Sequence, residues 1–340
     1  MKKSFRNRLL AVTAAASMSF LLLSGFDSEM TVEEVNDRVS ESMASMNGLN
    51  AEAYGIADLS IDVTADGQTQ SIPISGSVDY SVAMTLDPFV VGVSASLSGD
   101  ASAMGMAGSI DVETYIVGQE DGSGIVYARV PMDGDNGWHA AAMSAEDMEQ
   151  MFASVMAAFS QDPEEAISEM GIDIASLKDR IISNATLAPD PVNVNNVECY
   201  EITQTIDGNT LFEILSEVLD AYPLAGIDSD SLSAFQMLFS GIQIDGVTDC
   251  SVDDFTPVYA AIDLSGSDFS TIGQMIGAMM FSSDDASAMP EISVNVNALN
   301  LTMSYGEVPD QIEIPADALA AEVETTVDMS EIANAVQTAE

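Results

Sequence analysis

The feature that most constrains this chain is a long run of alternating residues between positions 72 and 86. One side of the run carries Ile72, Ile74, Val78, Tyr80, Val82, Met84 and Leu86, and the other carries mainly serine, threonine and aspartate. A period of two is typical of a β-strand, and a strand of this length spans roughly 50 Å. Ordinary strands are about 17–20 Å long. The run therefore predicts an extended antiparallel sheet with one apolar and one polar face.

Shorter alternating segments flank this run and recur towards the C-terminus. Strands are expected at 59–63, 89–97, 110–116, 124–130, 200–206, 242–252, 258–264 and 292–305. In the last segment the apolar positions change side, which predicts a bulge near Ala298.

Other segments have the helical spacing of apolar residues. Helices are expected at 29–46, 144–159, 174–182, 209–222 and 268–281, and another starts at Asp162-Pro163. Thr31 is placed to cap the first helix, and Ser144 with Asp147 fits a capping box for the second. Amphipathic helices need an apolar surface, so we expect an α+β fold in which helices cover the apolar face of the sheet.

The N-terminus has the pattern of an export signal. Four basic residues in 1–8 precede an apolar run at 9–23 that is short for a membrane-spanning helix. The run ends in Leu-Ser-Gly-Phe and resembles a bacterial lipoprotein signal, but Phe26 occupies the position of the lipidated cysteine. Either the lipoprotein signal is altered, or a general signal peptidase cuts nearby, or the segment stays as an uncleaved anchor. We expect an extracytoplasmic protein, secreted or associated with the cell envelope.

The charge of the chain restricts its partners. Its 340 residues include 55 acidic and 8 basic residues, and only Arg38, Arg129, Lys178 and Arg180 are basic after residue 25. Such an excess repels phosphate backbones and anionic lipid surfaces, which excludes nucleic-acid binding and leaves membrane contact to an uncleaved N-terminal segment. Repulsion between copies also favours a monomer. Hydrophobic residues make up 47% of the chain, which indicates a packed body and not a disordered one.

Two cysteines, Cys199 and Cys250, are present. In an oxidising compartment an even pair predicts a disulfide, which would stabilise the fold by roughly 4 kcal/mol through closure of a loop of about fifty residues. Free buried thiols and half of a metal site are the alternatives.

Three short segments resemble the LolA/LppX-like family of exported lipoproteins. They are Gly124–Val130 with the turn at 133–137 and Trp138 before the helix at Ser144, Glu198–Ile202 running through Asp207 and Gly208 into a helix, and Ile312–Pro315. The resemblance implies a curved antiparallel half-barrel whose concave side is covered by helices, with a lipid or lipid anchor bound between them. We therefore expect a single LolA/LppX-like domain at 26–330 after the signal segment at 1–25, and a tail at 331–340. The stretch Pro189-Asp190-Pro191 breaks the pattern and marks a possible subdomain break near 185–195.

Catalytic chemistry has little support in the sequence. No G-x-S-x-G motif occurs, and His139 is the only histidine, which we interpret as a surface or turn residue. Asp133, Asp135 and Asn136 resemble a calcium loop but lack its spacing, so no metal site is expected. We expect no cofactor and no catalytic residue.

Methionines gather on two of the expected helices. Because flexible thioethers suit an adaptable apolar groove, the candidate ligand-binding residues are Met148, Met151, Phe152, Val155, Met275 and Met279. Ordinary core packing is the alternative for each methionine. The leading hypothesis is a non-enzymatic envelope protein that binds a lipid or another apolar small molecule between sheet and helices. The alternatives are an acidic surface module for structure or interaction, without a ligand cavity, and a hydrolase that uses paired carboxylates.

Overall fold

The computed structural model describes residues 30–65, 67–102, 106–129, 137–149, 151–152, 184–221, 236–237, 239–274 and 291–323. Twelve strands form one antiparallel sheet in the order β6-β5-β4-β3-β2-β1-β12-β11-β10-β9-β7, with β8 also paired to β9. The strands are β1 (Gly48–Ala65), β2 (Gln68–Leu86), β3 (Phe89–Ala101), β4 (Met106–Gly118), β5 (Gly124–Arg129), β6 (His139–Met143), β7 (Ala185–Leu187), β8 (Val192–Val194), β9 (Val197–Asp207), β10 (Gln243–Ser251), β11 (Pro257–Asp263) and β12 (Glu291–Tyr305).

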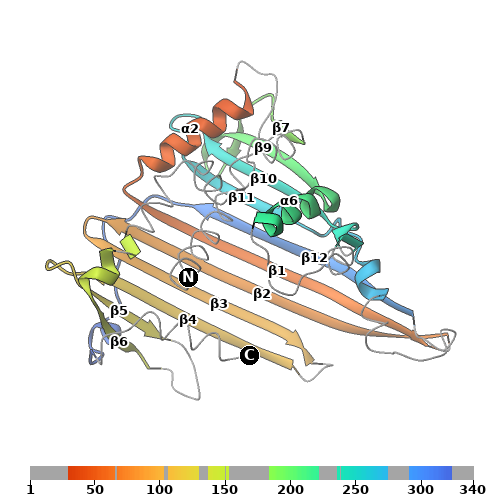
Figure 1. Ribbon diagram of the computed structural model, residues 1–340, viewed down its shortest axis with the longest axis horizontal. Coiled ribbons are helices and arrows are strands. Elements are labelled where there is room, and N and C mark those ends of the chain that lie inside the picture. Colours follow the sequence, from red (N-terminus) through yellow and green to blue (C-terminus); the bar gives the residue numbers. More distant parts are fainter. Residues whose placement is uncertain are drawn as a thin grey trace.

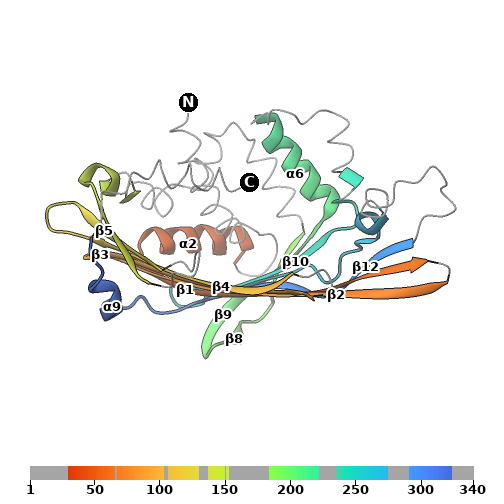
Figure 2. The same ribbon diagram turned by 90° about the horizontal axis from the view of Figure 1, so that it is seen from below.

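The sheet is curved and does not close into a barrel (Figures 1 and 2). Figure 2 shows α2 (Val32–Ala44) and α6 (Gly208–Ala221) on one side of it and α9 (Ala316–Leu319) on the other. Further helical residues are 145–149, 151–152, 236–237, 239 and 270–274. The expected α+β fold, a long-stranded curved sheet with helices on its apolar face, is confirmed.

The strand register separates the side chains into two faces, because directly opposed residues in antiparallel strands point to the same side. One row runs Met303, Ala53, Tyr80, Ala95, Val112 across β12, β1, β2, β3 and β4. We call the side that carries this row the apolar face.

The adjacent row on the opposite side is Ser304, Glu52, Ser81, Ser94, Glu113. We call this side the polar face. The alternation that predicted the strands therefore also assigns the two faces of the sheet correctly.

Helix α2 packs on the apolar face and forms a core cluster there. Its fully buried residues Val32, Val35 and Val39 lie against Ile202 and Cys250, whose side chains belong to the apolar face. The helix begins with the expected cap: the Thr31 hydroxyl accepts a hydrogen bond from the Glu34 backbone N–H, and the Glu34 carboxylate accepts one from the Thr31 N–H. The cap and the apolar stripe together fix where this helix starts and which side it buries.

A second cluster lies on the polar face and was not predicted. Tyr127 and Ala140 are buried there against Ala318 of α9, with Trp138 and Ile314 packed around them. The reason is that β4 and β5 carry apolar residues on both faces at this end, including Tyr115 and Ile125. The C-terminal segment therefore covers this end of the polar face.

The bulge expected near Ala298 is confirmed. Asp58 pairs with Ala298 whereas Leu59 pairs with Val296, so Asn297 is the extra residue on β12. The expected start of the first strand is wrong by eleven residues, because β1 begins at Gly48. Its first half carries alanine and glycine on the apolar face, and these residues give little signal of a strand.

The expected disulfide is not formed, because Cys199 and Cys250 are both free and buried. Cys199 lies opposite Ser251, and Cys250 lies opposite Tyr200. This offset of one residue directs the two thiols to opposite faces of the sheet. The sequence correctly implied that the two cysteines lie on neighbouring strands. It could not supply the register between β9 and β10, which decides whether a disulfide can form.

Candidate functional site

Met148 is the best-placed of the expected ligand-binding residues. Its helix begins after Ser144, whose hydroxyl donates to the Asp147 carboxylate at 2.6 Å and accepts from the Asp147 N–H at 3.2 Å. The Met148 side chain is buried on the apolar face beside Gly118 and Gly124, where a Cβ at Gly124 would clash with it. Glycine at 124 therefore leaves room for the Met148 side chain against the sheet.

Phe152 lies one helical turn further and closes the same end of the sheet. Its ring packs edge-on against Phe89, with centroids 5.3 Å apart and an interplanar angle of 78°. It is nevertheless 38% exposed, and Met151 beside it is half-buried. The expected residues Val155, Met275 and Met279 lie outside the described residues, as do the loop with Asp133, Asp135 and Asn136 and the signal segment.

A strip of apolar side chains continues from this helix along β3 and β4 on the apolar face. We call it the apolar lane, and it consists of Val91, Val93, Leu97, Ile110, Val112 and Ile116. Its register pairs Val91 with Ile116 and Leu97 with Ile110.

Exposure rises along the lane. Near the helix, Met84 and Met148 are 4% and 6% exposed, whereas Leu97 and Ile110 at the far end are 49% and 53% exposed. The four lane residues between these ends are half-buried. The lane is therefore a track that starts in a packed cluster and opens to solvent.

The lane was not singled out by sequence reasoning, which placed the ligand on the methionine-bearing helices. The alternation at 89–97 and 110–116 did identify these residues as the inner side of two strands. What it could not show is how far each helix reaches along a strand, because amphipathicity gives a helix a face but not a position on the sheet.

A second hollow lies at the end of α2, against the turn between β10 and β11. This pocket of about 420 Å³ is lined by Arg38, Glu41, Ser42, Ser45, Met46, Asp254, Phe255 and Thr256. Phe255 adopts a positive φ of 60°. Its ring stacks on Tyr200 at 5.7 Å, and the Arg38 guanidinium lies 5.1 Å from the ring centroid. Because acidic and basic groups both line it, the pocket offers no single charge preference for a ligand.

Among the described residues of the polar face, Asp249 has a buried carboxylate and is 2% exposed. Burial, reinforced by the charge of Glu201, raises the pKa of Asp249 to about 6. Within the described ranges no three histidine, cysteine or acidic side chains are grouped to hold a metal ion. His139 is exposed at the start of β6.

In the part of the chain that the structure describes, no helix has the length and apolar character needed to span a bilayer.

No protein-family model matches the chain, and no curated protein matches it. Three solved structures are weakly similar. An outer-membrane lipoprotein-sorting protein domain from Vibrio parahaemolyticus is 7% identical, with 84% of this chain and 94% of that one covered and a TM-score of 0.19. A DUF1329 family protein from Desulfovibrio piger is 9% identical, with coverages of 82% and 92% and a TM-score of 0.17.

The third structure is a β-barrel-like protein of the DUF1849 family from Brucella abortus. It is 10% identical, with coverages of 76% and 96% and a TM-score of 0.17. Similarities this weak leave function to be argued from the chain itself, and membership of the LolA/LppX-like family stays a prediction.

Proposed function

We propose that this chain is an exported, non-catalytic envelope protein that holds an elongated apolar ligand, such as the hydrocarbon chain of a lipid, on the apolar lane. The observation that carries the proposal is the rise in exposure along the lane from Met148 to Leu97 and Ile110. Monomeric soluble proteins rarely leave contiguous apolar strips uncovered unless the strip binds something.

The dimensions of the lane suit a hydrocarbon chain. Six residues separate Val91 from Leu97, which corresponds to about 20 Å of strand. Each methylene group buried on such a surface contributes about 0.8 kcal/mol, so a long chain gains affinity along its whole length. Helix residues Met148 and Phe152 provide the closed end of the track.

The net charge of −47 restricts the head of the ligand. An anionic head group would be repelled by the acidic surface, whereas a neutral or cationic one would not. Export rests on the basic and apolar pattern at residues 1–25. The absence of a catalytic role is supported by the lack of a nucleophile motif and by the exposed position of His139.

The proposal is tested by replacing apolar residues of the lane with asparagine, whose polar amide group disfavours contact with a hydrocarbon chain. The double variant V93N/V112N should bind a fluorescent acyl-chain probe with a neutral head at least about tenfold more weakly than the original chain, since two partly buried valines are lost. Ser109→Asn, on the polar face of β4, is the matched control and should bind normally. Equal probe affinity in all three proteins, or no binding by the delipidated original chain, would exclude the lane as a lipid site.

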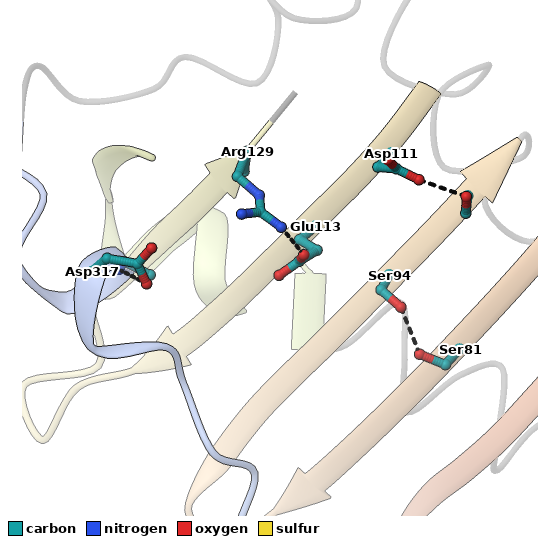
Figure 3. Close-up of polar contacts among 8 residues, drawn as sticks. Ser81, Ser94, Asp111, Glu113, Arg129 and Asp317 are labelled. Atoms are coloured by element: carbon teal, nitrogen blue, oxygen red, sulfur yellow. Dashed lines mark hydrogen bonds and ion pairs between the residues drawn. The ribbon is translucent and has the colours of Figure 1, made fainter. Parts of the chain in front are cut away.

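A second candidate function, an acidic interaction module, is favoured by the polar face. Side chains on β2, β3 and β4 form a hydrogen-bonded array there, with Ser81 to Ser94 at 2.8 Å and Ser96 donating to Asp111 at 2.5 Å (Figure 3). Such an array presents many fixed acceptors to a partner. This function predicts calcium- or salt-dependent association of a protein that binds no acyl probe.

A further inference from the structure

Strand β4 is longer than the strand beside it on the outer side. It pairs with β3 from Met106 to Val117, but it pairs with β5 only from Glu113 to Gly118. Within the described residues, the outer backbone edge of 106–112 therefore has no neighbouring strand. Residues 107–111 are exposed, and Figure 1 shows β4 running past the end of β5.

The first and last strands of the sheet are short or occupied on their outer sides. At one end, β6 has a parallel bridge between Ala140 and Val323 on its outer side. At the other end, β7 and β8 have three residues each. An exposed strand edge presents unpaired N–H and C=O groups that template the addition of another strand, and proteins usually shorten or cover such edges. Strand β4 departs from this rule at 106–112, as do β2 at 68–74, where Pro73 interrupts the edge, and β12 at 291–298.

Side chains at this edge differ between the two faces. On the apolar face, Ile110 and Leu97 lie side by side and are about half exposed. On the polar face, one row runs Asp79, Ser96, Asp111, with both carboxylates exposed and Ser96 hydrogen-bonded to Asp111. A strand added at this edge would place alternate side chains beside an apolar pair and beside a carboxylate.

We propose that the edge at 106–112, which has no neighbouring strand among the described residues, docks an extended segment of another protein in which apolar and basic residues alternate. Main-chain hydrogen bonds to β4 supply the pairing, Ile110 contacts the apolar side chains, and Asp111 pairs with the basic ones. The net charge of −47 adds long-range attraction for a basic segment. This inference does not rest on the proposed lipid site.

A second copy of this chain is a poor occupant of the same edge. Antiparallel pairing of two β4 edges about a twofold axis brings the Asp111 carboxylates of both copies to one side of the joined strands. It also joins two bodies that each carry a charge of −47. A basic partner removes both penalties.

Hydrogen exchange measured with a synthetic peptide tests the pairing. The probe is an eight-residue peptide of alternating valine and lysine with blocked ends. It should slow amide exchange in residues 106–112 of the full chain. The same peptide methylated on every backbone nitrogen keeps its charge but cannot form a ladder, and it should give no protection. Equal protection by both peptides, or protection only elsewhere in the chain, would overturn the proposal.

Charge reversal tests the pairing side chain. Asp111→Lys should weaken binding of the valine–lysine peptide about three- to fivefold, which is the effect of one cross-strand charge pair. Asp58→Lys is the matched control, because Asp58 lies on the polar face of β1, an inner strand paired on both sides. An equal loss of peptide affinity in both variants would mean that the peptide responds to the net charge of the protein and not to Asp111. Dimerisation of the chain without peptide, with amides 106–112 already protected from exchange, would also contradict the proposal. The edge would then be occupied by a second copy of the chain.

Discussion

Asp249 is the residue with the least favourable environment among the described side chains. Its carboxylate is buried on the polar face, and one oxygen, Oδ1, has no hydrogen-bond partner. Glu201 lies directly opposite on β9. Burying an incompletely paired carboxylate disfavours its charged form, which is why the pKa of Asp249 rises from 3.8 to about 6. The folded state therefore binds this proton more tightly than the unfolded state does.

Asp249→Asn should consequently stabilise the protein at pH 7.5. The cost of ionising Asp249 in the folded state is absent below its ordinary pKa, grows as the pH rises towards 6, and is complete above 6. A rise of about two pKa units corresponds to at most about 3 kcal/mol. Urea unfolding at pH 7.5 and pH 4 should show the gain only at pH 7.5. The exposed neighbour Asp253→Asn is the control and should change the unfolding free energy by less than about 0.5 kcal/mol at either pH.

The two thiols give a second prediction at the residue scale. Burial, with Cys199 and Asp249 nearby, raises the pKa of Cys250 to about 12, and burial also raises the pKa of Cys199. Native protein should therefore resist a thiol-reactive dye at pH 8, because the thiolate is the reactive form. In denaturant without reductant, two thiols per chain should react. Finding none under those conditions would show a disulfide and contradict the register of β9 and β10.

At the scale of elements, sequence periodicity located most of the structure. Capping residues placed the starts of α2 and of the helix after Ser144. At the start of α6 the Asp207 carboxylate accepts a hydrogen bond from the Thr210 N–H at 2.8 Å, a cap that was not predicted. The first half of β1 was not predicted, because alanine and glycine have little preference for strands. The α9 segment was not predicted, because it packs against apolar strand residues on the face that was expected to be polar.

The anchoring of α2 makes a prediction about its core side. Val35→Ala removes two methyl groups from a fully buried site and should lower the unfolding free energy by about 2 kcal/mol. Asp37→Ala, on the exposed side of the same helix, should change it by less than about 0.5 kcal/mol. Chemical denaturation of both variants measures the difference. Similar values for the two would mean that α2 is not held to the sheet by its valine stripe.

At the scale of the whole molecule, the large negative net charge is the feature that most affects stability. Of the four basic residues after position 25, two fall in the described residues, and Arg129 pairs with Glu113 on the neighbouring strand (Figure 3). Most carboxylates thus face one another across solvent, and their repulsion opposes folding. This feature was readable from composition alone, since net charge does not depend on the fold.

Screening should relieve this repulsion. Raising sodium chloride from 10 mM to 500 mM shortens the Debye length from about 30 Å to roughly 4 Å, so the melting temperature should rise by several degrees. Millimolar calcium should act at lower concentration. Differential scanning calorimetry at fixed pH measures the effect. A melting temperature that does not respond to ionic strength would show that the carboxylates do not repel one another enough to matter.

The candidate site was only partly predictable. Met148 and Phe152 were singled out because helical spacing marks inward-facing side chains, and their part in ligand binding stays a prediction. The apolar lane could not be found in the same way, because Val93 and Val112 have the same pattern as covered core residues. Whether such a residue is covered depends on where a helix ends on the sheet, which is a property of the whole arrangement.

The central claim is that a hydrocarbon chain lies along the apolar lane. The most direct measurement is to bind a neutral lipid with a photoreactive group in its acyl chain, cross-link it, and identify the modified residues by mass spectrometry. The account predicts adducts on β3 and β4 at lane residues such as Val93, Leu97 and Val112. Adducts confined to polar-face residues such as Ser94 and Ser109, or no adducts at saturating lipid, would contradict it.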